Sequence, residues 1–85
     1  MTIDVGERGL AFDPVAVHVD PGTRIVWKWT GRGTAHNVAA QRGATFASDI
    51  RSSDTYEWVA EGGPIVAYQC DPHAGQGMRG VVVVE

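Results

Sequence analysis

Three side chains that can bind a soft metal ion lie close together near the C-terminal end of the sequence. Cys70, His73 and Met78 offer a thiol, an imidazole and a thioether, and Gly75 and Gly77 lie between the last two. Glycine permits the close backbone turns that bring such side chains to one point. Singly, a cysteine or a methionine is usually a core residue, and a loop histidine is usually solvated. Their joint occurrence on one short loop predicts a metal site.

A fourth donor must come from another part of the chain, which has two further histidines, His18 and His36. His18 alternates with Val17 and Val19 on the polar side of a predicted strand, so we assign it to solvent. His36 follows a glycine-containing break at residues 31–34, where a loop leads into the next predicted strand. His36 is therefore the predicted second imidazole ligand.

This donor set favours copper over other metals. Two imidazoles and a thiolate with a weak thioether are the ligands of blue-copper electron-transfer sites. Structural zinc sites complete their shell with thiolates, imidazoles or carboxylates. Iron–sulfur clusters need more than the single cysteine of this chain. We therefore predict one copper ion, cycling between Cu(I) and Cu(II), with the ligands His36, Cys70, His73 and Met78.

Length, charge and composition limit the other possibilities. The 85 residues are enough for one hydrophobic core, so we expect a single domain over residues 1–85. The net charge of −3 argues against nucleic acid as a partner. One cysteine can form no internal disulfide. No apolar run reaches the length of a membrane span, and the first residues have no secretory signal pattern. We therefore expect no membrane span in this chain.

Short alternating segments separated by glycine and proline predict the strands that must position these donors. In residues 24–30, the side chains of Ile25, Trp27 and Trp29 fall on one face, which predicts that they enter the core. Residues 47–53 are the one candidate for a helical turn. Several short strands with turns between them are typical of an antiparallel-rich sandwich or barrel. The predicted strands are residues 15–19, 24–30, 36–38, 55–60, 65–70 and 81–84.

Four segments occur in an order that is typical of a known family. They are residues 9–14, a turn at 20–23 that leads into residues 26–29, the pair His36–Asn37, and the loop Cys70-x-Pro72-His73-x4-Met78-x-Gly80. With these segments the chain resembles the small cupredoxins of the plastocyanin and halocyanin group over nearly its whole length. The His73-to-Met78 spacing is longer than in amicyanin-like proteins and shorter than in azurin-like ones. The resemblance implies an all-β fold, a cupredoxin-like Greek-key β-sandwich of about seven or eight strands.

The resemblance also implies a role for each predicted ligand. His36 would be the buried ligand from the first loop, and His73 the ligand near the surface. Cys70 would provide the thiolate that gives the site its intense colour, and Met78 would provide the long axial contact.

Two further residues match positions that tune the copper in this family. Asn37 would direct its backbone N–H at the Cys70 sulfur, and its side chain would connect the two ligand loops. Pro72 has no N–H and cannot donate a second hydrogen bond to the thiolate. The reduction potential should therefore be lower than in sites with two such donors.

The resemblance implies one-electron transfer between redox proteins, without enzymatic catalysis. Redox partners would dock transiently at an apolar patch around His73, formed by Gly33, Ala35, Pro72, Ala74 and Met78. The charged residues expected at its rim are Arg32, Arg79 and Asp71. We expect a monomer in an extracytoplasmic location, which could be a periplasm, a compartment like the thylakoid lumen, or the outer surface of a membrane.

Other functions fit the sequence less well than electron transfer. A copper chaperone or storage domain would favour exposed tracts rich in methionine and histidine, but this chain has only Met1 and Met78 as methionines. An oxidase or reductase needs further metal sites, and only His18 remains for one. The chain could also be one domain of a larger membrane-anchored or multidomain redox protein. A fold kept for structure alone would not need four intact ligands.

Overall fold

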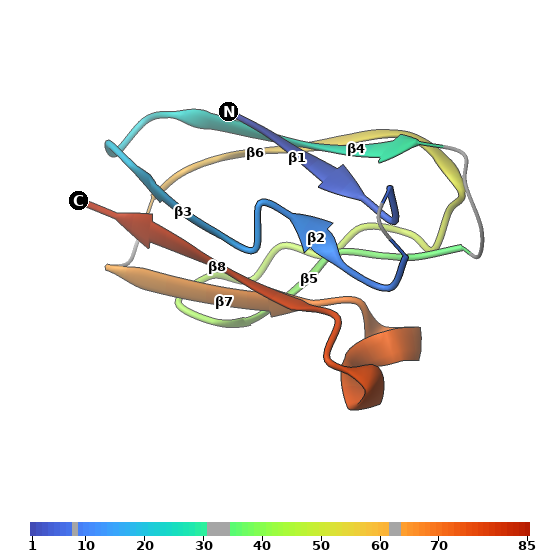
Figure 1. Ribbon diagram of the computed structural model, residues 1–85. Coiled ribbons are helices and arrows are strands. Elements are labelled where there is room, and N and C mark those ends of the chain that lie inside the picture. The colour runs from blue at the N-terminus through green and yellow to red at the C-terminus, as the bar shows by residue number, and fades with distance from the viewer. Residues whose placement is uncertain (8, 31–34, 62–63) are drawn as a thin grey trace.

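Alternating apolar residues produce two sheets that pack face to face (Figure 1). The computed structural model describes residues 1–7, 9–30, 35–61 and 64–85, which form eight strands. The first sheet has the order β2-β1-β4-β6, formed by Phe12–Asp13, Thr2–Val5, Arg24–Thr30 and Ser53–Val59. The second has the order β3-β8-β7-β5, formed by Ala16–Val19, Arg79–Val84, Ile65–Gln69 and Ala39–Arg42. The predicted all-β sandwich is confirmed.

Most neighbouring strands are antiparallel, but each sheet also contains one parallel pair. Strand β1 runs parallel to β4, and β3 runs parallel to β8. Parallel neighbours cannot be joined by a tight hairpin, so these pairs connect parts of the chain that are distant in sequence. Strands β1 and β2 were not among the predicted strands, and the strand predicted at residues 36–38 lies instead at Ala39–Arg42, as β5. Strand β2 has two residues and β1 has four, which is too short for alternation to be distinctive.

The face of β4 that was predicted to enter the core does so. Ile25 and Trp27 are fully buried and Trp29 is 4% exposed, whereas Arg24 and Lys28 on the opposite face are exposed. In the core, the Trp27 ring centroid lies 5.1 Å from that of Phe46 and 5.2 Å from that of Tyr68. Aromatic burial of this kind is a major source of stability in a small domain.

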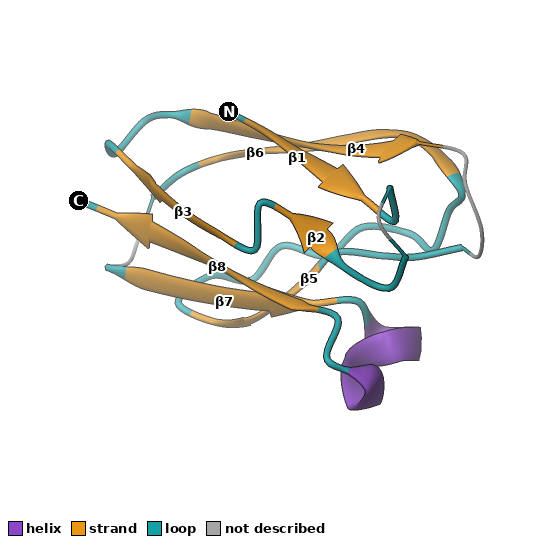
Figure 2. Cartoon of the chain, viewed as in Figure 1, coloured by secondary structure: helices purple, strands orange, loops and turns teal. Residues whose placement is uncertain are grey.

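The predicted helical turn at residues 47–53 is wrong. Ala47 pairs with Ala39 and Arg51 pairs with His36 in isolated antiparallel bridges, which require extended backbone. Within the described residues the one helix is instead η1, a 3-10 helix over Asp71–Gln76 (Figure 2). Proline in its first turn suits a helix start, and Gly77 ends it with a φ of 87°.

The helix η1 leaves the second sheet at the end of the sandwich opposite the C-terminus (Figure 1). It lies between β7 and β8, so the whole loop from Cys70 to Met78 lies at this end. No helix in the described part of the chain combines the length and the apolarity that crossing a membrane requires.

Candidate metal centre

The loop that carries three of the predicted ligands closes on itself through backbone hydrogen bonds. The Cys70 N–H donates to the Met78 carbonyl at 3.0 Å, which continues the β7–β8 pairing beyond Gln69 and Arg79. The His73 N–H donates to the Cys70 carbonyl at 3.1 Å, and the Met78 N–H donates to the His73 carbonyl at 3.2 Å. These bonds hold the three residues at the end of the sandwich.

The donor atoms of His36, Cys70 and His73 form a compact triangle. The two Nδ1 atoms are 3.1 Å apart, and the Cys70 Sγ lies 3.6 Å from His36 Nδ1 and 3.4 Å from His73 Nδ1. A point equidistant from the corners of such a triangle lies about 2 Å from each, which is close to a metal–imidazole bond length of about 2.0–2.1 Å. The three side chains therefore fit one transition-metal ion of ordinary bond length.

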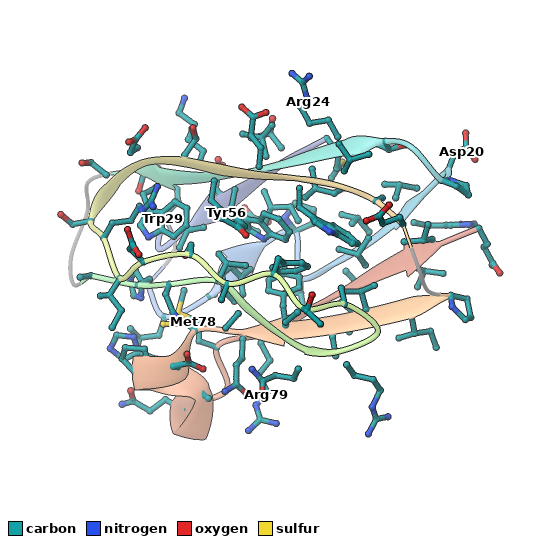
Figure 3. The ribbon with its side chains drawn as sticks, turned by 180° about the vertical axis from the view of Figure 1, so that it is seen from behind. Asp20, Arg24, Trp29, Tyr56, Met78 and Arg79 are labelled. Atoms are coloured by element: carbon teal, nitrogen blue, oxygen red, sulfur yellow. The ribbon has the colours of Figure 1, made fainter. Side chains whose placement is uncertain are left out.

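Burial differs among the four predicted ligand residues. Cys70 and Met78 are fully buried, His36 is 2% exposed, and His73 is half-buried. Met78 lies beside η1 at the same end of the sandwich as Trp29 (Figure 3). The arrangement agrees with the expected buried histidine and surface histidine.

The electrostatic environment of His36 favours its neutral form. Burial lowers the pKa of His36 below its usual value, and the neighbouring His73 lowers that pKa further. A neutral imidazole has a free lone pair, which is the form that binds a metal. The environment is therefore compatible with metal binding.

His36 lies between β4 and β5. It is held by hydrogen bonds from residues that are not its neighbours in the sequence. Its N–H donates to the Arg51 carbonyl and its carbonyl accepts the Arg51 N–H, both at 2.9 Å. The Trp29 Nε1–H donates to the same His36 carbonyl at 2.9 Å. Neither Trp29 nor Arg51 was predicted from the sequence to belong to the site. The signal available for Trp29 was a buried indole N–H, which needs an acceptor.

The side chain of Asn37 connects the two ligand segments, as the resemblance implies. Its Nδ2 donates to Asp71 Oδ2 at 3.0 Å, and its Oδ1 accepts the Asp71 backbone N–H at 2.7 Å. Gln69 Nε2 also donates to Asp71, at 3.0 Å from Oδ1. Hydrogen bonds from Gln69 and Asn37 lower the pKa of Asp71, so the carboxylate is part of this network and not only a rim charge. The contact of the Asn37 N–H with the Cys70 sulfur stays a prediction.

The surface around His73 agrees with the predicted apolar patch in part. Ala35 and Pro72 are exposed and Ala74 is half-buried. Met78 was expected in this patch, which is wrong because its side chain is fully buried in the core. The predicted members Gly33 and Arg32 lie outside the described residues.

Two other residues singled out in the sequence lie on the surface. Arg79 is exposed and its Nε donates to the Ala74 carbonyl at 3.4 Å. The His18 side chain is 64% exposed, and its Nε2 lies 3.7 Å from the Glu85 carboxylate. The assignment of His18 to solvent is confirmed.

Comparisons with known proteins agree with this geometry. A family model described as copper binding proteins, plastocyanin/azurin family, matches residues 1–85. Halocyanin from Natronomonas pharaonis is 42% identical over 84 residues, which cover 94% of this chain and 52% of halocyanin. The chain therefore spans about half the length of that relative.

Solved structures share the fold at lower identity. Plastocyanin from Dryopteris crassirhizoma matches with a TM-score of 0.84 at 20% identity, over 100% of both chains. Pseudoazurin from Methylobacterium extorquens AM1 matches with a TM-score of 0.67 at 27% identity, over 99% of this chain and 73% of pseudoazurin. A purple cupredoxin from Nitrosopumilus maritimus matches with a TM-score of 0.78 at 23% identity.

Proposed function

This chain belongs to the plastocyanin/azurin family of copper-binding proteins, and we propose that it carries single electrons between redox partners. Copper is its cofactor, and when bound it supplies a centre that accepts and returns one electron. The proposed ligands are His36, Cys70, His73 and Met78.

The observation that carries the proposal is the triangle of donor atoms from His36, Cys70 and His73. Its composition, two imidazoles and one thiolate, is that of a blue-copper site when a weak thioether completes it. Met78 supports that completion because its backbone is hydrogen-bonded to both Cys70 and His73. Zinc is less well supported, because structural zinc sites do not use a thioether as fourth ligand.

The protein's part in electron transfer is to hold these donors in one geometry. One donor comes from the segment between β4 and β5, and the others come from the β7–β8 loop. The paired hydrogen bonds of Asn37 and Asp71 connect the two segments. Donors held in this way move little when the charge of the metal changes, so little energy is spent on rearrangement in each transfer.

His73 is the proposed point of entry and exit for electrons, because it is the one predicted ligand residue that is not fully or nearly fully buried. Small apolar neighbours, among them Pro72 and Ala74, suit brief contacts with redox proteins, which use small interfaces. We propose a monomeric, non-enzymatic carrier with one domain over residues 1–85, in an extracytoplasmic location. Since the chain spans about half of its halocyanin relative, the same domain could act within a longer redox protein.

Adding Cu(II) to the purified protein tests the proposal. An intense blue colour that bleaches with ascorbate is expected. The Cys70→Ser variant should keep its fold and should not become blue. A pale copper complex in the parent protein, or a blue Cys70→Ser variant, would contradict the ligand assignment. Electron transfer is then measured as the rate of electron exchange between the oxidised and the reduced protein. An undetectably slow electron exchange would contradict the carrier function.

A further inference from the structure

His36 is the one proposed ligand that lies outside the loop from Cys70 to Met78. The loop residues hold one another through their backbone hydrogen bonds, whereas His36 depends on contacts from other elements. The position of its Nδ1 relative to Cys70 and His73 is therefore determined by whatever holds its peptide group. A side chain that does so would influence the metal without touching it.

The His36 peptide is held from two directions. Arg51 forms a pair of backbone hydrogen bonds with it, each 2.9 Å long. The Trp29 Nε1–H donates a third bond, also 2.9 Å long, to the His36 carbonyl. The carbonyl oxygen thus uses both of its lone pairs, one for a backbone donor and one for the indole.

Trp29 is itself held in place. It lies on the core face of β4, is 4% exposed, and has the Arg51 guanidinium 5.4 Å from its ring centroid. Arg51 is anchored in turn, because its Nη1 donates to the Thr55 carbonyl at 2.8 Å. Trp29 and Met78 lie at the same end of the sandwich (Figure 3). The Trp29 indole therefore connects the first sheet to His36, the predicted ligand outside the β7–β8 loop.

From these contacts we infer that Trp29 is a positioning residue for copper, acting through the His36 peptide. A phenyl ring would fill most of the same buried space but could not donate to the carbonyl. The indole N–H, and not only its bulk, is what this role requires. The inference about metal affinity rests on the proposed copper function, but the inference about the His36 peptide does not.

Trp29→Phe is the test, and Trp27→Phe is its matched control. Trp27 lies on the same strand and the same core face, but its Nε1, unlike that of Trp29, makes no hydrogen bond to the His36 peptide. In metal-free protein, Trp29→Phe should accelerate hydrogen exchange of the His36 amide by about fivefold to tenfold, the factor expected when one supporting hydrogen bond is lost. In Trp27→Phe, exchange at this amide should change by less than about twofold relative to amides of the β7–β8 pair.

Copper provides the second readout. Trp29→Phe should weaken Cu(I) binding by about 10- to 100-fold in competition with a chelator, and should alter the copper hyperfine splitting in the electron paramagnetic resonance spectrum. Trp27→Phe should change neither. Equal effects of the two variants, on exchange and on copper, would overturn the inference and leave Trp29 as a core residue. Failure of the parent protein to bind copper would instead contradict the proposed function, while the exchange result still tests the positioning role.

Arg51→Met keeps the inference testable if Trp29→Phe does not fold. It removes the guanidinium over the Trp29 ring but leaves the backbone pair with His36. We expect His36 amide exchange and copper binding to change in the same direction as in Trp29→Phe, but less. Arg24→Met is the control, because Arg24 is an exposed arginine that pairs with Glu57 on the outer face of the first sheet. A change in Arg24→Met as large as that in Arg51→Met would also overturn the inference.

Discussion

The Nδ1 atoms of His36 and His73 lie 3.1 Å apart, although the two residues are separated by 37 positions in the sequence. Each Nδ1 also lies within 3.6 Å of the Cys70 sulfur. Placing the buried His36 imidazole and the half-buried His73 imidazole beside the buried Cys70 thiol costs desolvation that ordinary core residues would avoid. A metal ion held by His36, Cys70 and His73 would offset that cost, because it would interact with all three donors at once.

Replacing His36 should therefore abolish the copper site, and replacing His18 should not. His36→Ala removes one corner of the donor triangle, so we expect copper affinity to fall by more than about 100-fold. This exceeds the usual effect of losing a residue that only hydrogen-bonds to a metal ligand. His18→Ala is the control, since that side chain is 64% exposed. Copper titration followed by absorption measures both. Retention of the blue absorption in His36→Ala would show that another residue completes the site.

Met78→Leu should raise the reduction potential while keeping the blue colour. Met78 is fully buried, and a leucine of similar volume should cost less than about 1.5 kcal/mol of stability. Loss of the thioether removes a donor that favours Cu(II), and a rise of about 59 mV would correspond to a tenfold change in that preference. Voltammetry measures the potential, with the equally buried Ile25→Leu as control. An unchanged or lower potential in Met78→Leu would exclude the axial role.

Asn37→Ala should loosen the connection between the two ligand segments. The change removes the hydrogen bond to Asp71 Oδ2 and leaves the Asp71 N–H without its acceptor. We expect the free energy of unfolding of the metal-free protein to fall by about 1–3 kcal/mol. Copper affinity should fall by about 10- to 100-fold.

Urea unfolding and chelator competition measure these two effects of the Asn37 change. Gln41→Ala is the control, because the exposed Gln41 makes a local bond of 3.3 Å to the Ala39 carbonyl. If both variants lose the same stability, the bridge between Asn37 and Asp71 has no special importance.

Gly80→Ala should destabilise the protein, and Gly75→Ala should not. A methyl group on Gly80 would overlap atoms of the Tyr68 ring, whereas one on Gly75 would enter open space. The Tyr68 ring has little room to move, because it is 1% exposed and packs edge-on against Phe12, with the two ring centroids 4.7 Å apart. Overpacking of this kind costs about 1–3 kcal/mol, against less than about 0.5 kcal/mol for an unhindered surface change. Thermal or urea unfolding compares the two variants, and equal stability would contradict the packing described for Tyr68.

Much of the fold could be predicted because its signals are local. The alternation of Ile25, Trp27 and Trp29 predicted the buried face of β4, since successive side chains of a strand point to opposite faces. The helical turn predicted at residues 47–53 was wrong because the contacts that shape this segment are not local. There the Val38 N–H donates to Ser48 Oγ and the Arg51 backbone pairs with His36, and both partners are distant in sequence.

The sequence by itself determined the chemistry of the proposed site, because a thiol, an imidazole and a thioether on one short loop carry their own metal preference. The tertiary structure alone decided which groups surround that chemistry. It brings His36 beside His73 at one end of the sandwich, directs Asp71 to Asn37, and places the Trp29 indole on the His36 carbonyl. These contacts join different strands and loops, so their geometry depends on how the two sheets pack and has no periodic signal in the chain.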